Sequence, residues 1–207
     1  DEINRTPPKT QSALLEAMQE RSVTNAGNKY ELDNPFFVLA TQNPIEQEGT
    51  YPLPEAQLDR FMFNVLLDYP QFDEEIKIVK QTTSDYYSSV KKIMTAEEIV
   101  FYQNILRKIP INDNVIEYAV GLVVKTRPKI DMASEKIKEY ISWGAGPRAS
   151  QFMLLGAKCY AAINGKYSPD IEDVKAVAKP ILRHRIVRNY KAEAEGISVD
   201  NIIDSIL

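Results

Sequence analysis

The most restrictive pattern in this chain is a short, continuous apolar run from Phe36 to Thr41, closely followed by Asn43. An apolar run of this length is typical of a strand that is buried on both faces of a parallel sheet. A second strand is expected from Phe61 to Leu67. These runs predict an α/β fold with Asn43 just beyond a strand's carboxyl end, at the sheet edge where such folds bind ligands.

Local signals predict a helix and a hairpin before that run. Thr6 precedes Pro7-Pro8, and proline is tolerated in a first helical turn. A helical apolar stripe then predicts a helix over residues 8–19, formed by Ala13, Leu14, Ala17 and Met18. Residues 23–32 have β-forming residues on both sides of Asn25-Ala26-Gly27-Asn28, a turn that can reach positive φ, which predicts a hairpin.

Beyond Asp68-Tyr69-Pro70 the pattern changes to helices without strands. Helices are expected near residues 73–83, 95–108, 112–126, 132–142, 147–164 and 169–179, with a short closing helix within 199–207. Proline and glycine supply the breaks, and Lys179-Pro180 is expected to end the helix before it. We therefore predict two domains, an α/β part over residues 1–70 and an all-α part over residues 71–207.

The composition agrees with an ordinary globular protein of 207 residues, 44% hydrophobic and 26% charged. Cys159 is the only cysteine and His184 the only histidine, so neither an internal disulfide nor a zinc site of the usual ligands is expected. No stretch is apolar enough to span a membrane, and we expect a cytoplasmic location. The net charge of −4 gives no general attraction to nucleic acid or anionic membranes.

Four motifs follow one another in the first part of the chain: Asp-Glu-Ile-Asn-Arg at 1–5, Leu-Leu-Glu-Ala-Met-Gln-Glu-Arg at 14–21, Ala-Thr-Gln-Asn-Pro-Ile-Glu-Gln-Glu-Gly at 40–49, and Pro-Glu-Ala-Gln-Leu-Asp-Arg-Phe at 54–61. Two more lie at Gly146–Ser150 and Leu182–Arg185. In this order and spacing the chain closely resembles the MoxR family of AAA+ ATPases, and the resemblance covers essentially all of it.

The resemblance implies part of a P-loop NTPase core, a parallel sheet with helices, followed by an all-α lid. ATP and Mg²⁺ are then the expected cofactors. Asp1 matches the Walker B aspartate that holds Mg²⁺, Glu2 the acid that activates water, and Asn43 the sensor 1 residue. Arg60 matches the arginine finger that reaches the neighbouring subunit's site, and Arg148 matches sensor 2. Carboxylates, an amide and guanidiniums suit phosphoryl transfer, in which catalysis is mostly positioning and charge stabilisation.

Each residue also has a simpler interpretation. Asn43 before proline could cap a turn, and Arg60 could form a surface ion pair with Asp59. Arg148 opens a helix, where a cation is electrostatically unfavourable, which favours a functional role. Two further groups keep no assigned function: Arg5, and the basic stretch 183–188, which we interpret as a lid or intersubunit face.

A glycine-rich phosphate loop is not found in this sequence. The Gly165-Lys166 pair is followed by Tyr167 instead of serine or threonine and has no glycine five positions before it. We expect the chain to be the downstream part of a longer ATPase, and to hydrolyse ATP poorly or not at all by itself.

The resemblance implies a ring-forming motor, expected to be a hexamer, that remodels or matures a client protein complex. Metal-centre insertion and a partner with a von Willebrand factor A domain are further implications. A DNA-directed motor of the same clade ranks second, because hairpin residues 23–32 contain one cation, Lys29, against one anion, Glu31. A third alternative is a non-enzymatic interaction module, which predicts that Glu2→Gln leaves cellular function intact.

Overall fold

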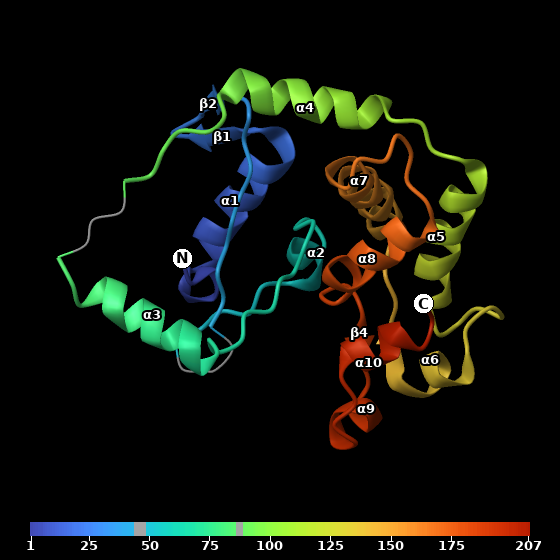
Figure 1. Cartoon of the computed structure of the whole chain (residues 1–207). Helices are drawn as coiled ribbons and strands as arrows, with labels where there is room; N and C mark the ends of the chain where they lie inside the picture. Colours follow the sequence, from blue (N-terminus) through green and yellow to red (C-terminus); the bar gives the residue numbers. More distant parts are fainter. Residues whose placement is uncertain (44–48, 86–88) are drawn as a thin grey trace.

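The computed structural model describes residues 1–43, 49–85 and 89–207 (Figure 1). The elements of the N-terminal region are the 3₁₀ helix η1 (Ile3–Arg5), α1 (Pro8–Glu20), β1 (Ser22–Asn25), β2 (Asn28–Glu31) and α2 (Glu55–Leu58). They are followed by α3 (Phe72–Thr82), α4 (Ala96–Lys108), α5 (Asp113–Lys125), α6 (Glu135–Tyr140), β3 (Ile141–Trp143), α7 (Pro147–Ile163), α8 (Ile171–Leu182), β4 (Val187–Arg188), α9 (Tyr190–Ala194) and α10 (Val199–Asp204).

The first helix and hairpin form as expected from their local signals. Helix α1 begins at Pro8 and ends at Glu20, and Arg21 caps it in the left-handed conformation with φ of 51°. Strands β1 and β2 pair antiparallel, with Asn25 opposite Asn28. The two turn residues, Ala26 and Gly27, have φ of 49° and 81°, as a two-residue hairpin turn requires.

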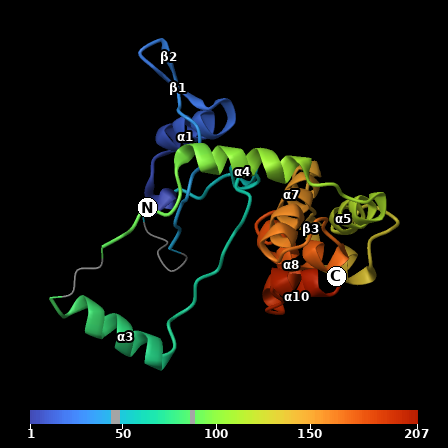
Figure 2. The same cartoon turned by 45° about the horizontal axis from the view of Figure 1, so that its top comes forward.

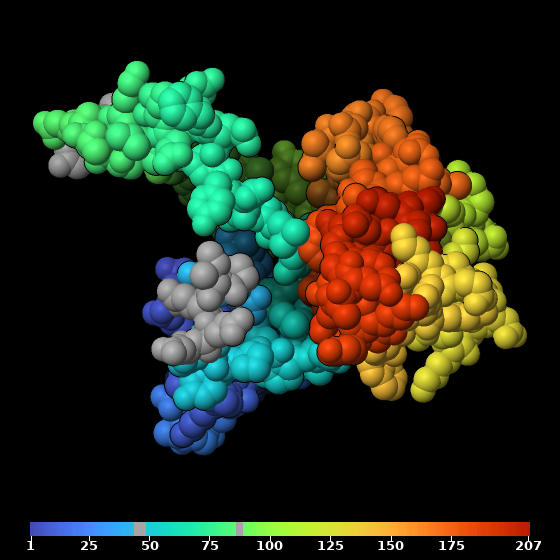
Figure 3. All heavy atoms as spheres, turned by 90° about the horizontal axis from the view of Figure 1, so that it is seen from below, coloured from blue at the N-terminus to red at the C-terminus, as the bar shows by residue number. Residues whose placement is uncertain are grey.

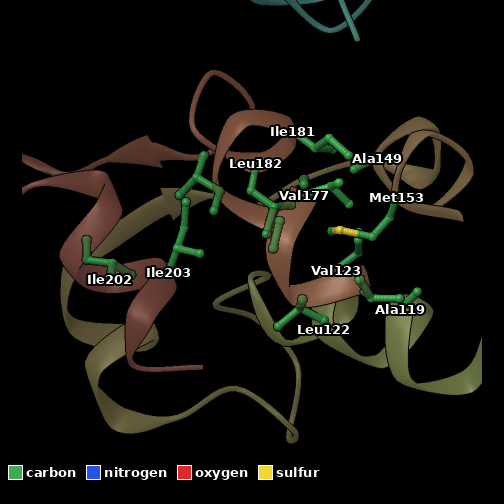
Figure 4. Close-up of a cluster of buried hydrophobic side chains, with 14 of the residues drawn as sticks. Ala119, Leu122, Val123, Ala149, Met153, Val177, Ile181, Leu182, Ile202 and Ile203 are labelled. Carbon is green, nitrogen blue, oxygen red and sulfur yellow. The ribbon is translucent and has the colours of Figure 1, made fainter. Parts of the chain in front are cut away.

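The hydrophobic core lies in the C-terminal helical region, residues 113–207 (Figure 4). Helix α7 packs most extensively against α8, and Gly156 permits the close approach, because a Cβ there would lie 3.3 Å from Val177. Fully buried side chains contributed by α5, α7, α8 and α10 include Val123, Met153, Ile181, Leu182, Ile202 and Ile203. The N-terminal region is bonded to this core-bearing region through residues 59–64.

Helices α3 and α4 are less buried. Helix α3 has no buried residue, and Figures 1 and 2 both show it standing away from the other helices. Helix α4 begins with a capping box in which Thr95 Oγ1 accepts from Glu98 N–H at 3.2 Å, and its far end contacts α7. In Figure 3 the blue-to-cyan N-terminal region meets the orange-to-red helical region, while the segment that contains α3 projects outward.

The expected parallel sheet is not formed among the described residues, whose only sheets are the antiparallel pairs β1–β2 and β3–β4. Residues 36–41 and 63–67 have no regular secondary structure. Thr41 O accepts a bond from Ile3 N–H at 3.0 Å, and Asn64 N–H donates to Pro180 O at 2.8 Å, which does not amount to a ladder. An apolar run becomes a strand when its neighbours pair with it, and no described segment does so here: Phe37 stays 70% and Leu39 84% exposed.

The helical prediction is wrong at two places. Helix α8 continues through Pro180 to Leu182, because proline in the last turn removes one backbone N–H but leaves the earlier bonds intact. The predicted helix over 132–142 stops at Tyr140, where residues 141–143 become β3 and pair with β4. The short elements α2 and α9 were not predicted at all. At residues 141–143 pairing with the distant strand β4 overrides the local helical pattern.

Candidate functional site

Thr41 joins the two acidic residues at the start of the chain. Its hydroxyl donates to Asp1 Oδ1, and the same oxygen accepts from Glu2 N–H at 2.8 Å. The adjacent Ile3 N–H donates to Thr41 O at 3.0 Å. Residues 1–3 are therefore fixed beside the end of the apolar run 36–41, although the two segments lie 40 positions apart in sequence. Thr41 belongs to a motif that was recognised, but this bridging role was not predicted.

Glu2 has an unusual backbone conformation for a residue with a side chain. Its φ of 46° and ψ of 56° lie in the left-handed region, where it precedes the 3₁₀ helix η1. Such conformations are uncommon outside glycine and persist only where surrounding contacts fix them. Its carboxylate forms an ion pair with Arg5, Nε to Oε2 at 3.2 Å, and both side chains are substantially exposed. Arg5, which had no assigned role, thus lies beside the candidate catalytic acid.

Asn43 lines a cavity of 650 Å³ next to this acidic pair. The wall also includes Thr41, Asn4 and His184, the last lying two residues beyond the C-terminal end of α8. Asn4 Oδ1 and His184 Nδ1 are buried atoms that have no hydrogen-bond partner among the described residues. The cavity therefore carries polar acceptors on an otherwise largely apolar wall.

The two arginine candidates share a second, smaller pocket of 320 Å³. Arg60 and Arg148 line it together with Glu20 and Phe152, and Arg60 Nε is buried without a hydrogen-bond partner among the described residues. Arg148 follows Pro147 at the start of α7 and forms an ion pair with Asp59, Nη1 to Oδ2 at 2.5 Å. The structure thus separates the candidates into an acidic group with Asn43 beside it and a pair of arginines.

Asp59 contacts a third arginine instead of its neighbour Arg60. Arg185 Nε donates to Asp59 Oδ1 at 2.9 Å, and the Arg185 side chain is 1% exposed. Burial lowers the pKa of the Arg185 guanidinium, and the Asp59 carboxylate opposes that shift. The interpretation of Asp59-Arg60 as a surface ion pair is therefore wrong, because both ion pairs of Asp59 are with the helical region.

The basic stretch that had no assigned role faces the N-terminal region with its first three residues. Arg183 Nη1 donates to Asn64 O at 2.7 Å and pairs bidentately with Asp200, both at 2.7 Å. His184 Nε2 bonds Phe61 O at 3.0 Å. Burial lowers the pKa of His184 to about 4, and the positive charge of Arg185 adds to the shift. His184 is therefore neutral at pH 7, with Nε2–H as the donor and Nδ1 as the unprotonated atom.

These residues fit the cofactors that the sequence suggests. Mg²⁺ is bound in nucleotide sites by one or two carboxylates together with substrate phosphates, and Asp1 beside Glu2 supplies such hard oxygen donors. The described residues contain no group of three or more histidine, cysteine or acidic side chains that would hold a metal without a substrate. Arg60 Nε is buried and has no partner in the part of the chain that the structure describes, and such a guanidinium nitrogen suits an anionic ligand such as a phosphate.

Comparison with known proteins identifies the class of protein. Residues 1–63 match the model described as the ATPase family associated with various cellular activities (AAA), and residues 133–206 match the AAA lid domain. A crystal structure of a candidate ATPase from Cytophaga hutchinsonii has a TM-score of 0.92 and 45% identity, and the match covers all of this chain and 63% of that one. The fold and the matches together define part of an AAA ATPase core with its helical lid.

Two curated relatives match along the whole chain. YeaC of Bacillus subtilis, described as uncharacterized, is 40% identical over 210 residues, and the chaperone MoxR1 of Mycobacterium tuberculosis is 39% identical over 207 residues. The chain spans 62% and 55% of the lengths of these relatives. The chain belongs to the MoxR-type family of AAA ATPases, and the C-terminal helical region, residues 113–207, is called the lid below. None of the helices that the structure describes is long and apolar enough to cross a membrane.

Proposed function

We propose that this chain carries the hydrolytic half of an ATP site and the lid of a MoxR-type motor. The observation that carries the proposal is the bridge from Thr41 to the Asp1 carboxylate and the Glu2 backbone N–H, which holds residues 1 and 2 at the end of the apolar run, beside the cavity that Thr41 and Asn43 line. Two acids with hydrogen-bonded geometry, beside an amide, are the groups that Mg²⁺-ATP hydrolysis requires. Family membership supports the same reaction.

Each acidic or amide residue has a separate role in this proposal. Asp1 holds Mg²⁺, which neutralises the developing phosphate charge when it is bound. Glu2 accepts a proton from the attacking water. Its carboxylate is accessible to solvent and its backbone is held in one conformation, and Arg5 is its ion-pair partner. Asn43 orients that water or contacts the γ-phosphate. The Thr41 hydroxyl fixes the position of Asp1 relative to Glu2.

The arginines act on phosphates from different subunits. Arg148 contacts the nucleotide of its own subunit, and Arg60 reaches the site of a neighbour, in a ring that we propose to be hexameric. Among the described residues Arg60 Nε is buried without a partner, which is compatible with a guanidinium that binds an anion. Hydrolysis drives chaperone-like remodelling of a client protein complex, as the name of the Mycobacterium tuberculosis relative suggests. Metal-centre insertion and a partner with a von Willebrand factor A domain belong to the same proposal.

Asp1→Asn tests the metal role, because asparagine keeps an acceptor for Thr41 but loses the negative charge. In the complete natural protein we expect the Mg²⁺ concentration for half-maximal ATP hydrolysis to rise roughly 10- to 100-fold. Asp33→Asn, at an exposed position of the N-terminal region, is the matched control and leaves that concentration unchanged. An unchanged Mg²⁺ dependence in Asp1→Asn removes Asp1 from the metal site.

A further inference from the structure

Arg185 makes more contacts with the segment around Arg60 than any neighbouring lid residue. Besides Asp59 Oδ1, its guanidinium donates to three backbone carbonyls of the segment: Asp59 O at 2.8 Å, Phe61 O at 2.5 Å and Met62 O at 3.3 Å. The remaining N–H donates to Ile181 O within α8. A guanidinium has five N–H donors, and here every one has an acceptor.

The acceptors of Arg185 lie on both sides of Arg60 in sequence. Asp59 precedes it, and Phe61 and Met62 follow it, so the backbone on either side of Arg60 is bonded to the segment that follows α8. Arg60 itself makes none of these bonds; it lines the 320 Å³ pocket, and its Nε has no hydrogen-bond partner among the described atoms. The Arg185 side chain also stacks on Phe152 of α7, with its guanidinium carbon 5.1 Å from the ring centroid.

Neighbouring lid residues extend the same attachment to residue 64. His184 bonds Phe61 O at 3.0 Å, Arg183 bonds Asn64 O at 2.7 Å, and Pro180 O accepts Asn64 N–H at 2.8 Å. Residues 59–64 are therefore bonded to the last turn of α8 and to the three residues that follow it. Because the Arg185 side chain is 1% exposed, exchange of its own bonds for solvent contacts is costly.

We propose that Arg185 is a positioning residue for Arg60, which couples the lid of one subunit to hydrolysis in the neighbouring subunit. This inference rests on the proposed function, in which Arg60 contacts the neighbour's nucleotide. The lid then has two roles. Arg148 contacts the nucleotide of its own subunit, and Arg185 positions Arg60, which contacts the nucleotide of the neighbouring subunit. A displacement of about 1 Å in such a group can reduce turnover 100-fold.

The primary variant is Arg185→Lys in the complete natural protein. Lysine keeps the charge but has three donors on one atom, so it cannot reproduce the planar fork. We expect kcat for ATP to fall about tenfold or more while KM stays unchanged, because the variant's own nucleotide site is intact. Arg188→Lys is the control: Arg188 lies in the same basic stretch but bonds Ile197 O within the lid. It leaves both parameters unchanged.

Mixed assemblies decide whether Arg185 acts in the neighbouring site. Differently tagged Arg185→Lys and Glu2→Gln subunits are co-expressed and purified through both tags. In such rings an intact Glu2 from one subunit meets an intact finger from the other, so the mixture hydrolyses ATP faster than the mean of the two separate variants. No gain over that mean shows that Arg185 serves its own subunit or only the fold, and overturns the proposal.

A parallel mixture of Arg60→Ala with Glu2→Gln separates this inference from the function on which it rests. If that mixture gains activity and the Arg185→Lys mixture does not, the finger assignment stands and the role of Arg185 is wrong. If neither gains, Arg60 does not act between subunits and both proposals fail. Should Arg185→Lys fail to fold, Arg185→Gln, which keeps two N–H donors for the carbonyls but loses the five-donor fork, replaces it with the same expected gain and the same overturning result.

Discussion

Arg148 Nη1 lies 2.5 Å from Asp59 Oδ2, an ion pair between the first turn of α7 in the lid and the residue immediately before Arg60. The other oxygen of Asp59 accepts from Arg185 Nε at 2.9 Å. One carboxylate therefore holds two arginines of the lid, and it lies next to a third arginine in sequence. Any nucleotide phosphate that takes Arg148 must compete with Asp59 for it.

Asp59→Asn removes the charge that both lid arginines share. We expect the free energy of unfolding to fall by roughly 3 kcal/mol, because the almost fully buried Arg185 then lacks its counter-ion while keeping its carbonyl partners. Urea unfolding followed by circular dichroism measures the change. Asp68→Asn is the control, since Asp68 bonds only the adjacent Tyr69 N–H in the described structure. Equal unfolding midpoints for both variants would contradict the account.

The lowered pKa of His184 predicts that the free energy of unfolding falls in mildly acidic solution. Its folded pKa of about 4 lies below the ordinary value of 6.5, so the unfolded chain takes up the proton first as the pH falls. The contribution is fully present above pH 6.5 and is lost between pH 6.5 and 4. The upper limit is about 3 kcal/mol, at roughly 1.4 kcal/mol per pKa unit.

His184→Gln tests that window, because glutamine keeps an N–H donor for Phe61 O but does not titrate. Lys166 lowers the pKa of Asp170, and Arg183 lowers the pKa of Asp200. These two carboxyls therefore stay ionised between pH 7 and 5, so they do not contribute to the change in stability in that interval. We expect the unfolding midpoint of the variant to change less between pH 7 and 5 than that of the natural protein. An identical pH dependence in the two proteins excludes His184 as the cause.

Gly144 marks a close approach of two backbone segments in the lid. A Cβ at this position would lie 2.4 Å from Thr126 O and 2.7 Å from Arg127 N, which are backbone atoms that cannot rotate away. Gly144→Ala is therefore expected to lower the free energy of unfolding by roughly 1–3 kcal/mol. Gly121→Ala, in α5 with no atom within 4 Å of the added carbon, is expected to raise it by about 0.5–1 kcal/mol. Thermal melts of the two variants should move in opposite directions.

The sequence predicts the elements that depend on nearby residues. Pro8 and its apolar stripe predict α1, and Asn25 to Asn28 predict the hairpin, because a helix start and a two-residue turn are decided within a few positions. The parallel sheet was expected from the run at 36–41, yet a sheet also requires partner strands, and the described residues supply none. Local patterns thus predict what a segment is suited to, and pairing decides what it forms.

The candidate site was predictable residue by residue but not as a set of contacts. The family motifs pointed to Asp1, Glu2, Asn43, Arg60 and Arg148, whose roles stay predictions. The contacts of Asp59 with Arg185 join positions 126 apart, and an ion pair of that span leaves no periodic or local signal in one sequence. The same holds for Thr41 and Asp1, 40 positions apart.

The most direct measurement compares ATP binding and ATP hydrolysis by the complete natural protein and its Glu2→Gln variant. Glutamine keeps the size of the side chain but cannot accept a proton from water, so we expect turnover to fall about 100-fold or more with unchanged nucleotide affinity. Glu117→Gln, at an exposed position of α5, provides the matched control. Hydrolysis at the natural rate by Glu2→Gln would contradict the proposal that these carboxylates form the hydrolytic half of an ATP site.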